Sequence, residues 1–464
     1  MLKSCIVWFK KDLRLSDNPA FLNAIKTGLP LVAVYILEED SNARPLGGAG
    51  KWWLYHALLD LKNSLKEQGG ELLLLKGNIQ ECLDYVIKTY HAKALFWNRS
   101  YEPWQVKRDS FLKTFYQKQG LEVSSFNASL LYEPFDIQTP QESFYKVFTP
   151  FWKACFKKSS PRSPLKECVE PVSWQPITPT LDLDDLDLLP SNPNWAASFT
   201  NHWNPTRKGG LTRLEYFLNN YLKNYKENRN IPSLDSTSKL SPYLHFGQLS
   251  VHEVFHKALE IASFLEIPQE DVTCFLSELG WREFSSYLLY HAPNSENESF
   301  TKKFQNFPWE FDQNLYDLWT KGKTGYPIVD AGMRQLWQTG WMHNRVRMIV
   351  ASFLTKHLNH SWKCGENWFW DTLVDADIAS NCFSWQWVAG CGADSAPYFR
   401  IFNPTLQGQK FDPEAQYIKK WVPELKYIPP ELCHEPWKKT SSYYKPIVEH
   451  TFARSKALER FKNL

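Results

Sequence analysis

Short apolar runs alternate with amphipathic stretches over residues 4–126 of the chain. The runs at 4–9, 31–37, 71–76, 94–98 and 122–126 have the length and composition of buried strands. Between them, apolar residues return every three or four positions, which predicts helices at 20–27, 51–68, 79–90 and 105–119. Because strands joined by helical crossovers pair in parallel, we expect an α/β domain with a parallel five-stranded sheet covered on both faces.

After residue 209, apolar residues recur with the spacing of α-helices over most of the chain. The clearest predicted helices are 211–224, 251–264, 272–290, 329–339, 344–357 and 368–373. Before them, residues 159–205 are rich in proline and contain an acidic patch at 181–189, which is typical of a connector wrapped on the surface. We therefore expect an α/β domain (1–135), a connector (136–208) and a larger all-α domain (209–464).

The bulk composition is that of an ordinary globular protein, with 43% hydrophobic and 22% charged residues. A net charge of +3 is small, so binding of nucleic acid requires locally concentrated cations. The nine cysteines include no C-x-x-C pair, which favours reduced thiols and argues against a metal site. With no signal-peptide core at the start and no membrane-length apolar run, we expect a soluble cytoplasmic protein.

Aromatic residues are the outlier at 16%, with 21 tryptophans. Most single tryptophans pack in a core, but here several recur beside polar and cationic residues. Glu278 is expected on one helical face with Trp281 and Arg282, three and four positions further on. A carboxylate, a flat ring and a guanidinium are poor material for an apolar core, although a structural ion pair alone would also account for them.

Three other segments carry candidate site residues. Asn344, Arg347 and Met348 share a second helical face, whereas Arg345 is expected to point elsewhere, towards solvent or a phosphate. The acids within 371–381 are, alone, typical of a solvated helix end. The hydroxyl-rich segment 235–241 precedes a proline, and hydroxyl and N–H groups that open a helix suit a pyrophosphate, although an ordinary N-cap would look the same.

Long motifs in these segments resemble one known family, the photolyase/cryptochrome flavoproteins. They follow in order over about 170 residues: TSKLS at 237–241, WREF at 281–284, TGYPIVDA at 324–331, MHNR at 342–345 and YFRIFNP at 398–404. The N-terminal WFKKDLR at 8–14 fits the same family, so the resemblance covers essentially the whole chain.

The resemblance implies an enzyme that uses blue light to split cyclobutane pyrimidine dimers in DNA, with FAD as its cofactor in the reduced, anionic form. The residues that it assigns to FAD are Tyr225, Thr237, Ser238, Lys239, Leu240, Ser241, Arg282, Asn344, Arg347, Asp375, Asp377 and Asn381. Arg347, paired to Asp375, would make negative charge tolerable in a dry pocket. Asn381 is expected near flavin N5, where a neutral amide can hydrogen-bond without adding charge.

The implied partner is UV-damaged DNA, whose dimer must leave the duplex to reach the flavin, as in other base-flipping enzymes, a class that includes photolyases. The residues assigned to the lesion or the DNA backbone are Arg229, Glu278, Trp281, Arg345, Met348, Trp387 and Arg400. Glu278, Asn344 and Asn381 are the expected catalytic residues. Trp385, Trp362 and Trp309 resemble the tryptophan chain that carries electrons from the surface to oxidised flavin, although core packing would explain each ring individually.

Details of the chain bear on which member of the family it resembles. Asn344 and Met348 resemble cyclobutane-dimer enzymes, since (6-4) photolyases carry a histidine pair where the single His343 stands. Plant-like cryptochromes tend to have aspartate in place of Asn381 and long C-terminal extensions. This chain has Asn381 and stops shortly after Trp437, and both features favour repair. The alternative is a cryptochrome, a blue-light receptor without repair activity. KWW at 51–53 and YEPW at 101–104 resemble class III photolyases.

A second, light-harvesting chromophore is expected near the N-terminal domain. Many folate-binding relatives have Asn-Glu where this chain has Trp-Gln at 104–105, which puts the usual folate-binding mode in doubt. Methenyltetrahydrofolate remains the first expectation and a deazaflavin the second. We expect the protein to be a monomer.

Overall fold

A parallel sheet of five strands forms the N-terminal part of the computed structural model, which describes residues 3–40, 43–166, 171–178, 181–439 and 443–464. The strand order is β3-β2-β1-β4-β5, and neighbouring strands pair in parallel, as the sequence pattern predicts. The strands are β1 (Ser4–Phe9), β2 (Leu31–Glu38), β3 (Leu72–Gly77), β4 (Ala92–Asn98) and β5 (Glu122–Phe126). Strand β1 is buried along its full length, as a strand covered on both faces must be.

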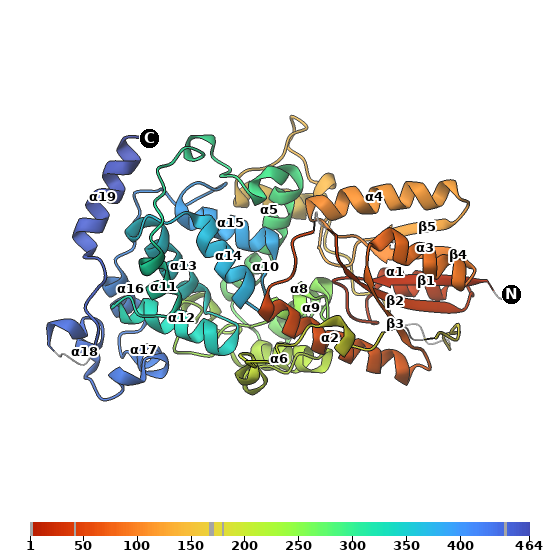
Figure 1. Cartoon of the computed structure of the whole chain (residues 1–464), viewed down its shortest axis with the longest axis horizontal. Helices are drawn as coiled ribbons and strands as arrows, with labels where there is room; N and C mark the ends of the chain where they lie inside the picture. Colours follow the sequence, from red (N-terminus) through yellow and green to blue (C-terminus); the bar gives the residue numbers. More distant parts are fainter. Residues whose placement is uncertain (1–2, 41–42, 167–170, 179–180, 440–442) are drawn as a thin grey trace.

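Four helices cover the two faces of this sheet: α1 (Pro19–Ile25), α2 (Gly48–Glu67), α3 (Ile79–Thr89) and α4 (Pro103–Lys118). Alternate β1 residues face opposite ways: Val7 packs in the same cluster as α1 and α2, whereas Trp8 packs in the cluster of α3 and α4. The predicted α/β domain is confirmed. Figure 1 shows the sheet at one end of the molecule and the later helices at the other.

The stretch expected to be a connector contains one regular helix, α5 (Phe148–Lys158), and otherwise irregular chain with short 3-10 turns. Helix α5 packs on the helical part of the molecule, where the ring of Phe151 contacts Phe284 and Tyr287. Further along, Trp174 forms a parallel bridge with Leu31 of β2. Cys168 and Pro179 of this stretch lie outside the described residues.

The rest of the chain is helical, as predicted. The helices are α6 (Arg207–Asn220), α7 (Tyr225–Asn228), α8 (Ser241–His245), α9 (Val251–Phe264), α10 (Gln269–His291), α11 (Gln313–Thr320), α12 (Pro327–Thr339), α13 (Asn344–Ser352), α14 (Trp362–Thr372), α15 (Ile378–Ala389), α16 (Pro404–Phe411), α17 (Gln416–Trp421), α18 (Pro430–Cys433) and α19 (His450–Lys462).

Several predicted helix boundaries were wrong; the expected helix 211–224, for example, is α6, which begins and ends four residues earlier. The expected helix 344–357 is α13 followed by a single π-helical turn, η6 (Phe353–His357), within which Lys356 is buried. The expected helix 368–373 begins earlier, at Trp362, after the N-cap residue Ser361. Gly365 conceals this start in the sequence pattern; the helix needs it because a Cβ atom there would lie 2.0 Å from the ring of Trp385.

Within the described ranges, no helix is both long and apolar enough to cross a membrane. The eight cysteines in these ranges are free thiols. The same residues include no group of three or more histidine, cysteine or acidic side chains that could hold a metal ion.

Candidate functional site

A cavity of about 390 Å³ lies among α10, α13, α14 and α15. Residues predicted from separate sequence segments meet there: Arg229, Glu278, Trp281, Asn344, Arg345, Arg347, Met348, Asp375, Asp377, Asn381, Trp385 and Trp387. Apolar residues, among them Leu288, Phe369 and Phe383, complete the lining. Such a mainly apolar cavity with a few convergent polar groups is typical of a ligand site.

Arg347 and Asp375 form the predicted ion pair in this cavity. The Nη2 atom of Arg347 donates to both carboxylate oxygens of Asp375, at 3.1 and 2.9 Å, and its Nε donates to the carbonyl of Met342 at 2.8 Å. The Asp375 side chain is only 3% exposed and also accepts a bond from the hydroxyl of Ser241. These partners hold the guanidinium in one position at the edge of the cavity.

Glu278 and Arg229 form a second ion pair, with Arg229 Nη1 2.5 Å from Glu278 Oε1. Burial raises the pKa of Glu278, and the positive charge of Arg229 opposes this rise. The free oxygen of Glu278 can therefore meet a ligand as an acceptor, or as a donor when protonated.

Trp281 forms a flat surface beside Glu278. The residue is 36% exposed, and its ring stacks on Phe148 of α5, with ring centroids 3.9 Å apart and planes at 11°. The main-chain N–H of Phe148 donates to Asp394 at 3.0 Å, which ties α5 to the loop after α15. Sequence reasoning missed Phe148 because it lies in the expected connector, where only the aromatic run of 144–152 sets it apart.

The residues expected to hold the pyrophosphate of FAD do not line the cavity. Thr237 and Ser238 offer their carbonyls to Arg213, at 2.5 and 3.0 Å, and the Lys239 ammonium pairs with Asp235. This loop contacts the cavity lining through Ser241, whose hydroxyl donates to Asp375. Leu240 and Tyr225 are buried, and the guanidinium of Arg229 lies over the Tyr225 ring.

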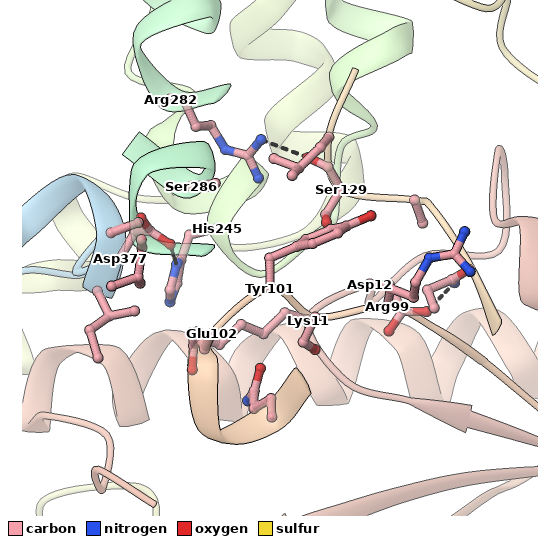
Figure 2. Close-up of a pocket in the computed structure, with 18 residues that line it drawn as sticks. Lys11, Asp12, Arg99, Tyr101, Glu102, Ser129, His245, Arg282, Ser286 and Asp377 are labelled. Carbon is pink, nitrogen blue, oxygen red and sulfur yellow. Dashed lines mark hydrogen bonds and ion pairs between the residues drawn. The ribbon is translucent and has the colours of Figure 1, made fainter. Parts of the chain in front are cut away.

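Arg282 lies elsewhere, so its expected common face with Glu278 and Trp281 was wrong. It donates to the carbonyl of Ser129 at 2.6 Å and lines a separate cavity of about 60 Å³, at the junction with the α/β domain (Figure 2). Positions three and four residues on from Glu278 diverge by about 100° around a helix, so Trp281 and Arg282 can face different cavities. Asp377 lines both cavities, and Figure 2 shows it beside His245.

Arg345 lies on the cavity lining, and the expectation that it points elsewhere was wrong. Its Nη2 donates to Asn230 at 2.6 Å and its guanidinium lies 4.4 Å from the centre of the Phe411 ring.

Arg400 is exposed on the loop before α16, and its carbonyl accepts a bond from Lys356 at 3.1 Å. Burial lowers the pKa of Lys356 to about 8. Nothing in the sequence pattern singles out this lysine.

The three tryptophans of the expected electron route have different surroundings. Trp385 lines the cavity, is 2% exposed, and contacts Phe369 and Trp319 edge-on. Trp362 is buried and donates to the hydroxyl of Ser299 at 3.3 Å, and Trp309 packs on Phe307. The route through them stays a prediction.

A further cavity, of about 520 Å³, lies at the carboxyl ends of β1 and β2. The rings of Trp8 and Trp104 line it, with the guanidinium of Arg108 about 5 Å from each ring centre, at 5.1 and 5.0 Å. Their two indole N–H groups are buried without a partner among the described residues. In open parallel sheets, ligands bind outside the carboxyl ends of the strands.

The chain matches two family models in the regions that contain these cavities. Residues 275–463 match the FAD binding domain of DNA photolyase, and residues 5–170 match the model described as DNA photolyase. The cavity among α10, α13, α14 and α15 fits the flat ring of a flavin: it has apolar sides and a polar edge at the Arg347–Asp375 pair, and the buried Trp385 indole N–H has no partner among the described residues.

Known relatives agree with these matches along the whole chain. A deoxyribodipyrimidine photo-lyase of Agrobacterium fabrum is 45% identical over 98% of this chain and 97% of its own length. Cryptochrome-1 of Arabidopsis thaliana is 37% identical over 93% of this chain and 64% of its own length. The chain belongs to the DNA photolyase family, as its motifs predict.

Solved structures show the same fold. A class III photolyase from Agrobacterium tumefaciens superposes with a TM-score of 0.96 at 44% identity, covering 100% of this chain and 98% of that one. An archaeal photolyase from Sulfolobus tokodaii, solved with two FAD molecules, superposes with a TM-score of 0.82 at 29% identity, covering 99% of this chain and 100% of that one.

Proposed function

We propose that the protein repairs cyclobutane pyrimidine dimers in DNA under blue light, with FAD and the flipped-out dimer side by side in the cavity among α10, α13, α14 and α15. One observation carries this proposal: the Arg347–Asp375 pair and the flat surface of Trp281 line the same cavity. A plain flavin carrier has no need of an exposed tryptophan and a carboxylate beside its cofactor.

Three of the chain's groups are suited to holding the flavin. The Arg347–Asp375 pair meets its polar edge, the apolar side chains of α14 and α15 enclose its ring, and Asn381 lies near N5. The segment 237–241 and Tyr225 remain our candidates for the diphosphate, with Ser241 linking them to Asp375. When bound and reduced, the cofactor supplies one electron to the dimer under light; the cyclobutane bonds then break and the electron returns.

The other side of the cavity is suited to the dimer. Trp281 and Trp387 offer apolar faces to the two fused bases, with Met348 beside them, and Glu278 and Asn344 meet the base edges by hydrogen bonds. Stacking and pairing are weak at a damaged step, so extrusion costs less there than at intact DNA. Arg229, Arg345 and Arg400 supply local positive charge for the backbone phosphates.

The light-repair assay separates this function from that of a cryptochrome. Reduced protein is illuminated with an oligothymidine that contains a dimer, and intact thymines are measured by chromatography. We expect conversion in the light and none in the dark. If reduced FAD is bound and no dimer is converted, the proposal fails and the blue-light receptor function takes its place.

We also propose an antenna chromophore in the cavity at the carboxyl ends of β1 and β2. The aromatic rings and the guanidinium of Arg108 suit a flat, acidic molecule, with methenyltetrahydrofolate first and a deazaflavin second. Denaturing the purified protein and identifying the released chromophores by absorption tests this assignment. We further propose that the protein acts on UV-damaged DNA as a monomer.

A further inference from the structure

Glu366 of α14 is a fully buried carboxylate beside the cavity among α10, α13, α14 and α15. It is 0% exposed and accepts hydrogen bonds from Arg44 at 2.7 and 3.1 Å and from Lys363 at 3.1 Å. It also accepts a bond from the side-chain amide of Asn381 at 2.7 Å. A buried carboxylate with this many donors is held in a single position.

These contacts dictate the orientation of the Asn381 amide. Its Nδ2 atom donates both to the Glu366 carboxylate, at 2.7 Å, and to the main-chain carbonyl of Glu366, at 3.0 Å. Both acceptors lie on the α14 side of Asn381, so a rotated amide would place its oxygen against two other oxygens. The Oδ1 atom is therefore turned away from Glu366, and Asn381 lines the cavity.

Arg44 brings the α/β domain into this arrangement. It lies on the segment between β2 and α2, and its guanidinium lies 4.3 Å from the centre of the Trp370 ring. It also donates to Asn367 at 2.9 Å, besides its two bonds to Glu366. Arg44 is thus a residue of the α/β domain that holds the Glu366 carboxylate in place beside a cavity in the helical domain.

We propose that Glu366, held by Arg44, is a positioning residue that keeps the oxygen of Asn381 towards flavin N5 and so favours the reduced cofactor. This inference rests on the proposed function, which places the flavin beside Asn381. Reduced flavin carries a hydrogen on N5, whereas oxidised flavin has only a lone pair there. An amide oxygen can accept a bond from the first and cannot donate one to the second.

The test is the reduction potential of the flavin in the purified holoprotein with Glu366→Gln. A glutamine can donate to Asn381 as well as accept from it, so only the main-chain carbonyl of residue 366 still favours the original orientation of the Asn381 amide. At a fixed solution potential, we expect the ratio of reduced to oxidised flavin to fall roughly tenfold. This corresponds to a reduction potential lower by about 30 mV for a two-electron couple. Redox titration followed by flavin absorption measures this shift.

Two further variants keep the test decisive. Arg44→Gln should lower the potential in the same direction by a smaller amount, and it carries the test if Glu366→Gln does not fold. Asn367→Ala removes an Arg44 contact that does not involve Glu366 and should leave the potential unchanged. In the reduced-minus-oxidised infrared difference spectrum, the side-chain carbonyl band of Asn381 should shift in Glu366→Gln but not in Asn367→Ala.

The inference is overturned if Glu366→Gln binds FAD and shows both the wild-type reduction potential and an unshifted Asn381 band. If Glu366→Gln does not fold, the same result in Arg44→Gln overturns it. That outcome leaves the proposed function intact as long as the wild-type protein repairs dimers. A wild-type protein that binds no FAD would instead remove the proposed function itself.

Discussion

Trp281 lies face to face on Phe148, with ring centroids 3.9 Å apart and planes only 11° from parallel. One face of the indole is therefore packed against α5, and the ring is held in place beside the cavity, although the residue as a whole is 36% exposed. A flat surface that is rigid before the ligand arrives loses little freedom on binding, so its stacking contributes to affinity.

Trp281→Ala should weaken binding of dimer-containing DNA by about 1–3 kcal/mol, the range found for base–aromatic stacking. Trp281→Phe is the matched control and should recover part of this loss. Phe148→Ala should act in the same direction with a smaller effect, because the indole remains but is no longer supported. Fluorescence anisotropy with labelled lesion DNA measures all three, and unchanged affinity in Trp281→Ala would remove this residue from the lesion site.

Trp385→Phe should slow the light-driven reduction of oxidised FAD. Phenylalanine keeps an apolar aromatic ring at this position but is far harder to oxidise than tryptophan. Repair should be spared when the flavin is reduced chemically, because the electron given to the dimer does not pass through this ring. Time-resolved absorption follows the photoreduction, and a rate equal to that of the wild type would show that the electron route is wrong.

Asp375→Asn should reduce the FAD content of the purified protein. The substitution leaves the Arg347 guanidinium in a half-buried site without its carboxylate, and breaking a buried pair is costly. Asp317→Asn, an exposed partner of Lys321, is the matched control and should retain FAD. The ratio of flavin to protein absorption measures the effect; equal flavin content in the two variants would contradict the assigned role.

Glu283 predicts a pH dependence of stability. Burial raises the pKa of Glu283 from 4.5 to about 7, although the positive charge of Arg282 and the N–H groups of Tyr132 and Leu131, which donate to the carboxylate, oppose the rise. Since the pKa in the folded state is above that in the unfolded state, its contribution to stability is fully present below about pH 4.5 and is lost as the pH rises through about 7.

In Glu283→Gln the side chain cannot titrate, so the variant should not lose this contribution to stability as the pH rises. Between pH 5 and 8, the unfolding free energy of the variant should rise relative to that of the wild type by up to about 3 kcal/mol. Denaturant unfolding of both proteins at four pH values measures the difference. Because the two proteins share all other titrating groups, the contributions of those groups cancel in it. A difference that stays constant across this range would show that Glu283 is ionised throughout it.

The sequence pattern predicted the elements whose periodicity is strong and local. The five strands follow from apolar runs, whereas the pairing of Arg347 with Asp375 was expected only from the family resemblance. Phe148 could not be predicted, because its contact with Trp281 joins the expected connector to α10. The placement of Arg282 also depended on a partner far away in the chain, the carbonyl of Ser129.

Contacts between the two domains were the least accessible to sequence reasoning. The interaction of Arg44 with Glu366 joins residues 322 positions apart, and no local pattern marks either of them. In the same way, Gly365 looks like a helix breaker in the sequence, and its reason is visible only where the Trp385 ring lies against it. Tertiary packing therefore overrides local propensity at the positions that shape the cavity.

The most direct test of the central claim, that a dimer enters the cavity beside the reduced flavin, is the fluorescence lifetime of that flavin. The lifetime is measured for the reduced holoprotein alone, with intact oligothymidine, and with the same oligothymidine carrying a dimer. We expect the dimer to shorten the lifetime, because electron transfer competes with emission, and the intact strand to leave it unchanged. A lifetime that is the same with all three samples, at concentrations where lesion DNA is bound, would contradict the account.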